Sequence, residues 1–428
     1  AVEILEKTAV KPEKSVGRKE CRLVTFDLPY LAFFYNQKLL IYRGGEDFDE
    51  IFASLRAGLA AVLEEFHQLA GRLDKDEDGV FKVVYDEEAE GVELVSAAAP
   101  ELDVAELTAE EGTSKFKDLL PYNGILNLEG LHRPLLAVQV TKLKDGVALG
   151  CAFNHAILDG TSTWHFMSSW AGICNGGDSI PVVPFLERTK ARDVRVKLNL
   201  SKPSDAPEHA KAGPVLREKV FKFSEAAIDE IKAKANDAVA AAEKPFSTFQ
   251  SLSAHVWQAV CRARSLAPED YTVFTVFVDC RKRVDPPMPE SYFGNLIQAI
   301  FTVTAAGLVL GSPPDFGAGL IRSAIEAHDA TAIQKRNEEW ESKPIIFEFK
   351  DAGVNCVAVG SSPRFKVYDI DFGFGAPESV RSGLNNRFDG MVYLYPGKSG
   401  GRSIDVEISL EASAMEKLEK DKDFLIGA

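Results

Sequence analysis

The chain has 428 residues, of which 46% are hydrophobic and 26% charged, and its formal net charge is −15 at pH 7. This length exceeds that of one typical domain and suits two. An acidic chain lacks the basic face with which nucleic-acid-binding proteins neutralise phosphates, and the high apolar content excludes disorder as the main state. We therefore expect a globular protein of two domains that binds no nucleic acid.

Cysteine usage and the N-terminal residues indicate the cytosol. Six cysteines lie far apart, without a CxxC pair, which is typical of free thiols in a reducing compartment. The charged N-terminal stretch AVEILEKTAVKPEK lacks the apolar segment of a signal peptide. The uncharged stretch 291–314 is interrupted by polar residues, and a membrane span needs about 20 mostly apolar residues. It is predicted to be a buried strand that runs into a loop, so no transmembrane segment is expected.

The first half mixes helix and strand patterns. Apolar residues recur at three-to-four spacing over 48–73, which predicts an amphipathic helix, and residues 79–85 alternate like a half-buried strand. The runs 135–142 and 147–153 are separated by Lys-Asp-Gly and predict a hairpin. A helix through Trp170 follows, with Thr161 and Ser162 as candidate N-caps.

Residues 175–213 form the clearest boundary, with two adjacent glycines, several prolines and no sustained period. Beyond it, helices are predicted from Ser224 and near Ser247, and strands over 217–223, 271–278, 364–370, 390–395 and 403–410. The sequence therefore predicts an α/β protein with an N-terminal domain at 1–174, a crossover linker at 175–213 and a C-terminal domain at 214–428.

His155 is the first candidate for chemistry. It follows a hydrophobic strand and precedes Asp159 by four residues, in the string HAILDG. Imidazole suits proton transfer at neutral pH when its tautomer is fixed. The alternative is a buried histidine whose hydrogen bonds are made within the core and which has no catalytic role. This alternative stays open because the HxxxD pattern fixes only two positions and is therefore weak evidence. A zinc site is not expected, since His165 lies in a helix among aromatic residues and further ligands are lacking.

Asp159 has two possible roles. In a catalytic triad it would require a nucleophilic serine on a strained turn, and the chain contains no GxSxG string. Followed by glycine, Asp159 is better placed to hold a turn or to pair with a distant arginine. The cluster Arg281-Lys282-Arg283 at the end of a strand is the candidate partner, and a solvated basic patch is its alternative interpretation.

A third motif, DFGFG, comprises Asp371, Phe372, Gly373, Phe374 and Gly375. Its two glycines permit a positive φ or a close backbone approach, so the motif predicts an ordered bend. The kinase DFG likeness is superficial, because no glycine-rich loop or HRD-type loop accompanies it. The GxG pattern alone is too weak to indicate a dinucleotide site.

Taken jointly, these strings resemble the plant BAHD acyl-CoA acyltransferases. HAILDG in mid-chain, the long linker, YFGN at 292–295 and DFGFG near the C-terminus occur in the order and spacing of that family. The likeness covers essentially the whole chain. The strings TFDLPYLAFFYNQKLLIY, NHAILDGTSTWHFMSSWA and FVDCRKRVDPPMPESYFGNLIQAIF are most similar to cutin-associated members.

The resemblance implies two similar-sized domains, each like chloramphenicol acetyltransferase, joined by a crossover loop and enclosing a central substrate channel. Acyl-CoA would enter from one face and the acceptor from the other. His155 would deprotonate the acceptor, which attacks the thioester directly without an acyl-enzyme. Asp159 would point away from the channel and pair with Arg281, and the DFGFG bend would be structural.

The sequence departs from the family pattern at two places, one in the structural bend away from the channel and one near the expected oxyanion site. Phe374 replaces the tryptophan of the usual DFGWG. Gly360-Ser361-Ser362-Pro363 replaces a Thr-Ser-Trp-like string that helps to hold the oxyanion. A serine hydroxyl or backbone amide could still donate there, and the lost indole would widen the pocket. Ser361 and Ser362, together with Thr163 and Phe33, are therefore the candidate oxyanion or channel residues.

The resemblance predicts a monomeric enzyme without a resident metal or cofactor, which uses acyl-CoA as co-substrate and a small-molecule hydroxyl acceptor. A hydroxy fatty acid or glycerolipid of cutin formation is the expected acceptor. Three alternatives stay open: a hydroxycinnamoyl-type transferase for phenolic or amine acceptors, a non-catalytic binding protein of the same fold, and a hydrolase. The missing nucleophile disfavours the hydrolase.

Overall fold

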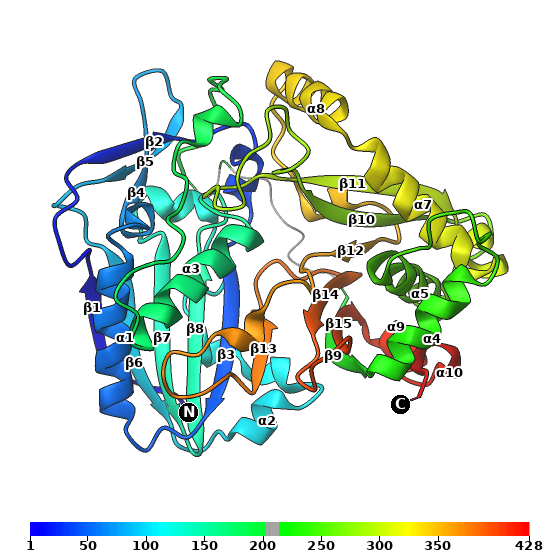
Figure 1. Ribbon diagram of the computed structural model, residues 1–428, viewed down its shortest axis with the longest axis horizontal. Helices are drawn as coiled ribbons and strands as arrows, with labels where there is room; N and C mark the ends of the chain where they lie inside the picture. Colours follow the sequence, from blue (N-terminus) through cyan, green and yellow to red (C-terminus); the bar gives the residue numbers. More distant parts are fainter. Residues whose placement is uncertain (203–204, 206–213, 428) are drawn as a thin grey trace.

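The computed structural model describes residues 1–202, 205 and 214–427, which form two mixed α/β halves side by side (Figure 1). Each half is built on a six-stranded sheet, with orders β1-β6-β7-β8-β3-β13 and β11-β10-β12-β14-β15-β9. A small sheet, β2-β5-β4, accompanies the first. The expected α/β class and the two sheet-rich halves are confirmed.

The N-terminal sheet is covered on one face by α1 (Phe48–Val62) and α3 (Gly160–Cys174), and on the other by the short α2 (Val104–Thr108). Its first five strands are β1 (Glu3–Val10), β6 (Val92–Ala99), β7 (Leu136–Leu143), β8 (Gly146–Phe153) and β3 (Asn36–Arg43). The small sheet comprises β2 (Lys19–Arg22), β5 (Phe81–Tyr85) and β4 (Arg72–Lys75). The predicted hairpin is confirmed as β7 and β8, which are buried along almost their whole length because helices and loops cover both faces.

The C-terminal sheet contains β11 (Ile297–Ala305), β10 (Tyr271–Asp279), β12 (Val357–Val359), β14 (Met391–Pro396), β15 (Ile404–Glu411) and β9 (Leu216–Phe223). Its outer face carries a separate apolar core shared with helices. These helices are α4 (Glu225–Asn236), α5 (Thr248–Ala263), α6 (Ala306–Gly311), α7 (Pro314–Ala327), α9 (Ala412–Leu418) and α10 (Lys422–Leu425). Helix α8 (Ala330–Ser342) lies beside the junction of the two halves.

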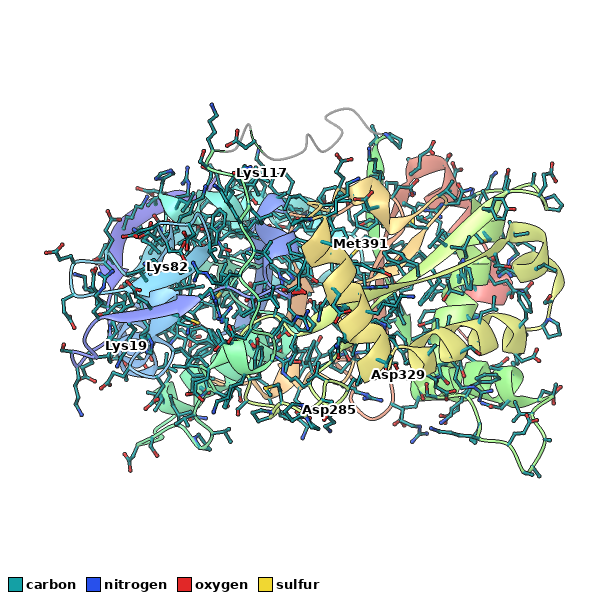
Figure 2. The ribbon with its side chains drawn as sticks, turned by 90° about the horizontal axis from the view of Figure 1, so that it is seen from above. Lys19, Lys82, Lys117, Asp285, Asp329 and Met391 are labelled. Atoms are coloured by element: carbon teal, nitrogen blue, oxygen red, sulfur yellow. The ribbon has the colours of Figure 1, made fainter. Side chains whose placement is uncertain are left out.

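One strand departs from the expected domain division. Strand β13 (Ser379–Ser382) falls within 214–428 but pairs antiparallel with β3 of the N-terminal sheet. In Figure 1 it stands between β3 and β14, at the seam of the two halves. Met391 of β14 lies at the same seam, near the middle of the view from above (Figure 2). Apolar side chains of β14 consequently belong to the N-terminal core.

The crossover segment is anchored to both halves. Over 175–202 it forms no sheet strand, but Phe185 bridges to Tyr292, and Arg188 is fully buried against Asp27. The Nη1 atom of Arg188 lies 3.1 Å from Oδ1 of Asp27. The remainder of the predicted linker, 203–204 and 206–213, lies outside the described residues.

Several local predictions need correction. The helix predicted over 48–73 ends at Val62, because the chain then turns through a short 3-10 helix into β4. The segment 364–370 is not a strand; it contains only a 3-10 turn, Val367–Asp369. The stretch 291–314 does contain a strand, β11, but it is an edge strand and is only partly buried. Phe301 is 40% exposed and Val303 is 60% exposed, and the strand runs into helix α6 and not into a loop.

Candidate active site

His155 lies in the turn between β8 and α3, close to the seam of the two halves. Asn127 fixes this turn: its Oδ1 accepts from the His155 amide at 2.9 Å, and its carbonyl oxygen accepts from Asn154 Nδ2 at 2.8 Å. The Asn127 side-chain amide also donates to the carbonyl of Tyr30 at 2.8 Å. One buried asparagine thus holds both the histidine turn and the segment that carries Tyr30.

The imidazole of His155 stacks on the Tyr30 ring, with centroids 4.5 Å apart and planes inclined by 17°. Nδ1 is buried and has no hydrogen-bond partner among the described residues, whereas the residue as a whole is only half-buried. Nε2 is therefore the nitrogen left for a substrate. Burial lowers the pKa of His155, as does the charge of Lys38, so the ring is neutral at pH 7.

The Asp159 carboxylate faces away from His155 and toward Arg281, as the sequence led us to expect. Arg281 donates from Nη1 to Oδ2 at 2.8 Å and from Nη2 to Oδ1 at 3.0 Å, and both side chains are buried. The Leu296 amide donates to Oδ2, and the Ser162 amide donates to Oδ1. Burial alone would raise the pKa of Asp159, but the guanidinium and these amides outweigh it and hold the pKa below its usual value.

Asp159 is also the N-cap of α3, in place of the predicted Thr161 and Ser162. An aspartate at this position satisfies an amide that the helix leaves without a partner and places negative charge at the positive end of the helix dipole. Asp159 therefore joins three structures: the histidine turn, α3 and the C-terminal half through Arg281.

A second tether reaches His155 from the C-terminal half. The side-chain amide of Asn295, the last residue of YFGN, donates to the carbonyl oxygen of His155 at 2.7 Å. Asp27 orients this amide, because its Oδ1 accepts from the Asn295 backbone amide at 3.0 Å and from Nδ2 at 3.2 Å. The Asp27–Arg188 ion pair links the same unit to the crossover segment.

A row of aromatic side chains begins at Tyr30 and includes Phe33, which is predicted from the sequence to be a channel residue. The Phe33 ring stacks on Phe349, with centroids 5.4 Å apart and planes inclined by 7°. Phe349 in turn stacks on Phe388 at 5.6 Å. Phe33 is half-buried, so it is suitably placed to contact an apolar substrate. Thr163 is not: it is buried on α3, and its hydroxyl donates to the Asp159 carbonyl at 2.8 Å.

The two candidate oxyanion serines have different surroundings. Both follow β12 and are half-buried. The Ser361 hydroxyl is buried and has no hydrogen-bond partner among the described residues, although it lowers the pKa of the neighbouring Tyr395. Ser362 accepts from the Arg364 amide at 3.2 Å. Ser361 is therefore the one of the two that makes no hydrogen bond within 3.5 Å in the described residues, and Ser362 only accepts one, so its proton is also available for donation.

The DFGFG bend lies on the N-terminal half. Asp371 Oδ1 accepts from the amides of Gly373 at 2.8 Å and Gly375 at 3.0 Å, and both glycines have positive φ. Phe372 packs edge-on against Trp170 at 4.9 Å, and Phe374 packs edge-on against Tyr42 at 4.9 Å. The bend anchors the chain before β13 on α3 and β3. Because Phe374 packs against Tyr42, its role is explained by packing, and no contact with a substrate is needed to explain it.

Sequence reasoning gave no individual role to four side chains that shape the site, namely Tyr30, Asn127, Asp27 and Asn295. Each is a polar or aromatic residue that acts across a large sequence separation, so spacing along the chain carries little signal. No cluster of three or more His, Cys, Asp or Glu residues suited to a metal occurs within 1–202, 205 and 214–427. In the same part of the chain, no helix is long and apolar enough to span a membrane.

The comparisons with known proteins agree with this geometry. A family model described as "Transferase family" matches residues 1–425. "BAHD acyltransferase DCR" of Arabidopsis thaliana is 62% identical, over 99% of this chain and 92% of that protein. The chain belongs to the BAHD acyltransferase family. It is accordingly an acyltransferase.

More distant relatives of this BAHD acyltransferase extend the comparison. "Hydroxycinnamoyltransferase 2" of Oryza sativa subsp. japonica is 33% identical, over 92% of this chain and 91% of that protein. The crystal structure of vinorine synthase superposes with a TM-score of 0.78 at 21% identity, covering 99% of this chain and 98% of the other. A Fusarium sporotrichioides TRI101 structure, complexed with coenzyme A and T-2, gives 0.75 at 21% identity, covering 95% and 98%. At such identities the two structures establish the fold.

Proposed function

We propose that this BAHD acyltransferase transfers an acyl group from acyl-CoA to the hydroxyl of a small-molecule acceptor, with His155 as the general base. The observation that carries the proposal is that no carboxylate of the described residues makes an ion pair or hydrogen bond with the His155 ring. Asp159, the one acid in its motif, is bound to Arg281 and two amides, so the imidazole acts as a base on its own.

The proton transfer would use Nε2 of the neutral imidazole. As Nε2 takes the hydroxyl proton, the acceptor oxygen bonds to the thioester carbonyl carbon and the carbonyl becomes an oxyanion. The C–S bond then breaks, and the CoA sulfur leaves with the proton that His155 holds. General-base catalysis contributes about 10²–10⁴-fold, and alignment of two substrates can supply much of the remaining rate enhancement.

Ser361 is the proposed oxyanion donor. Its buried hydroxyl has no partner among the described residues, so donation to a developing negative charge would break no hydrogen bond seen there. A preorganised donor of this kind typically contributes about 3–4 kcal/mol to the transition state. The proposal keeps Ser362 as a neighbour that shapes the pocket, because a smaller side chain stands there than the tryptophan of the family pattern.

We further propose a hydroxy fatty acid or glycerolipid of cutin formation as the acceptor. The support is the 62% identity to the DCR acyltransferase and the aromatic row of Tyr30, Phe33 and Phe349 beside the histidine. Rings of this kind bury aliphatic chains well. Phenolic or amine acceptors are the rival class, because relatives at about a third identity are named hydroxycinnamoyltransferases.

The test is a thiol-release assay with acyl-CoA donors of graded length against panels of hydroxy-fatty, glycerolipid, phenolic and amine acceptors. Acceptor-dependent release with the hydroxylated lipids supports the proposal. Release only with phenols or amines would move the enzyme to the rival class. Release without any acceptor would indicate a hydrolase, and a chain that binds acyl-CoA without release would be a binding protein. Sedimentation of the same preparation tests the expected monomer.

A further inference from the structure

Lys38 is a buried cation with no role in the chemistry above. It lies on β3, opposite Cys151 of β8 and Ser382 of β13, and is only 4% exposed. Its ammonium donates to Ser382 Oγ at 3.3 Å and to the Tyr395 hydroxyl at 3.4 Å. Both contacts are long for charge-assisted hydrogen bonds, which are typically about 2.7–2.9 Å.

The charge of Lys38 is not neutralised within the described residues. No carboxylate lies within 4.0 Å of its Nζ there, whereas the nearest buried cations do have acid partners. Arg387 lies 2.7 Å from Glu407, and Arg381 lies 4.0 Å from Asp405. A buried charge normally requires an opposite charge or a dense set of hydrogen bonds. Burial and the Arg387 charge accordingly lower the pKa of Lys38 to about 8.

Two hydroxyl groups contact this ammonium, and a third hydroxyl lies next to one of them. Ser382 Oγ and the Tyr395 hydroxyl lie 2.6 Å apart, and each accepts from Lys38. The Ser361 hydroxyl, on the loop after β12, is buried and lies near enough to Tyr395 to lower the pKa of that phenol. Ser361 is half-buried as a residue, whereas Lys38, Ser382 and Tyr395 are buried, so the group comes closest to the surface at Ser361.

The group therefore lies between the two sheets, with one member each from β3, β13, β14 and the loop after β12. The positive charge of Lys38 contributes to lowering the pKa of His155. The backbone of β3 connects the two places, since Asn36 pairs with Phe153, two residues before His155. Lys38 itself pairs with Cys151, four residues before His155, so it lies on the strand pair that leads into the His155 turn.

We propose that Lys38, Ser382 and Tyr395 form a binding site for a carboxylate of the acceptor substrate, beside the loop that carries Ser361. The inference rests on the proposed transferase function and specifies its acceptor as a hydroxy acid with a free carboxyl group. A carboxylate supplies the one negative charge that Lys38 lacks, and the hydroxyls can donate to its oxygens. A phosphate dianion would need a second cation, and both neighbouring arginines already have acid partners.

The experiment compares a medium-chain ω-hydroxy acid with its methyl ester as acceptors at pH 7. The wild-type enzyme is expected to prefer the free acid in kcat/KM by about 10- to 100-fold, the range of a hydrogen bond to a charged group. Lys38→Met should bring the acid-to-ester ratio close to one. The matched control is Lys142→Met, an exposed lysine on β7, which should keep the wild-type ratio.

A second arm assigns the carboxylate to its substrate. Acyl-CoA donors with and without a terminal carboxyl group are compared on one neutral acceptor. A donor preference that Lys38→Met removes would place the site on the acyl side and overturn the acceptor assignment. An equal rate for acid and ester in the wild type, or a preference retained by Lys38→Met, overturns the site itself. If Lys38→Met does not fold, Ser382→Ala should reduce the preference.

Binding measurements separate this proposal from the transferase proposal. The free acid should raise the melting temperature of the wild type more than the ester does, and this difference should vanish in Lys38→Met. If no acceptor releases thiol but the selective stabilisation is present, the transferase proposal fails and the carboxylate site stands. If thiol is released without selective stabilisation and without an acid preference, the carboxylate site fails and the transferase proposal stands.

Discussion

The side-chain amide of Asn295 donates to the carbonyl oxygen of His155 at 2.7 Å, so a residue of the C-terminal half holds the backbone of the candidate base in the N-terminal half. Asp27 accepts from the same side chain and fixes its orientation. The position of the imidazole therefore depends on how the halves meet. The Asn295 amide, together with the Asp159–Arg281 pair, thus links the geometry of the candidate site to the interface between the halves.

Removal of this amide should misplace the base without unfolding the protein. We expect Asn295→Ala to lower kcat by about 10²-fold, the scale of a small misplacement of a catalytic group, with a much smaller change in KM. Asn295→Asp restores the size but sets a carboxylate against Asp27, so it should not rescue the rate. Steady-state kinetics with circular dichroism check this, and a kcat unchanged in Asn295→Ala would show that Asn127 alone fixes the turn.

His155→Ala should abolish transfer. The loss expected of a general base is about 10²–10⁴-fold in kcat, while acyl-CoA binding and the melting temperature stay near wild type. Tyr30→Phe is the control, because it retains the stacked ring and removes a hydroxyl that takes no part in the proposed mechanism. A His155→Ala variant with more than a small residual rate would contradict the general-base role.

The activity should depend on pH in a manner set by the environment of His155. Burial lowers the imidazole pKa below its usual value of 6.5, so the neutral, active form is retained as the pH falls through 6.5. The acid limb of log kcat/KM is therefore expected below pH 6.5. The unfolded chain binds the proton more readily than the native one, so this group also destabilises the fold as the pH falls further. An acid limb above 6.5 would contradict the assignment.

The Asp159–Arg281 pair should affect stability and activity together. Asp159→Asn leaves a buried guanidinium without its charge partner, which typically costs about 3–5 kcal/mol of unfolding free energy. Arg281→Ala should produce a similar loss, and the double variant should be less than additive because both changes remove one interaction. Denaturant unfolding measures this. Normal stability with no activity in Asp159→Asn would make the carboxylate a direct catalytic partner.

Ser361→Ala tests the oxyanion proposal. A lost donor should lower kcat by about 10²–10³-fold with little change in stability, since the hydroxyl has no partner in the described structure. Ser362→Trp tests the wider pocket: short acyl or acceptor chains should still react, and long ones should lose kcat/KM. Wild-type kinetics for both variants on every chain length would place the string outside the channel.

The sequence was informative where a signal is local. Apolar, β-branched runs and turn residues predicted the β7–β8 hairpin. The HAILDG string at the end of a predicted strand indicated His155 as the candidate base and Asp159 as the partner of Arg281. Segments whose conformation depends on distant partners were less predictable. Residues 364–370 read as a strand because apolar and charged residues alternate, but the chain there wraps the N-terminal half and pairs with no neighbour as a strand.

The same reasoning explains which site residues escaped sequence analysis. Lys38 looks like an ordinary strand lysine until β13 and β14 bury it, and both strands follow it by more than three hundred residues. Asn295 was noticed only as part of a motif, because its partner His155 lies 140 residues away. Polar contacts of this kind are determined by the tertiary fold, and the spacing of residues along the chain does not predict them.

The transfer of β13 to the N-terminal sheet has a consequence for how the molecule can be divided. A fragment that stops at the crossover segment would leave β3 as an open edge, with unpaired backbone groups ready to pair with another chain. The C-terminal fragment would carry a strand without a sheet. Neither half is thus a self-sufficient unit, and gene-level shuffling between relatives should succeed only when β3 and residues 379–382 come from the same parent.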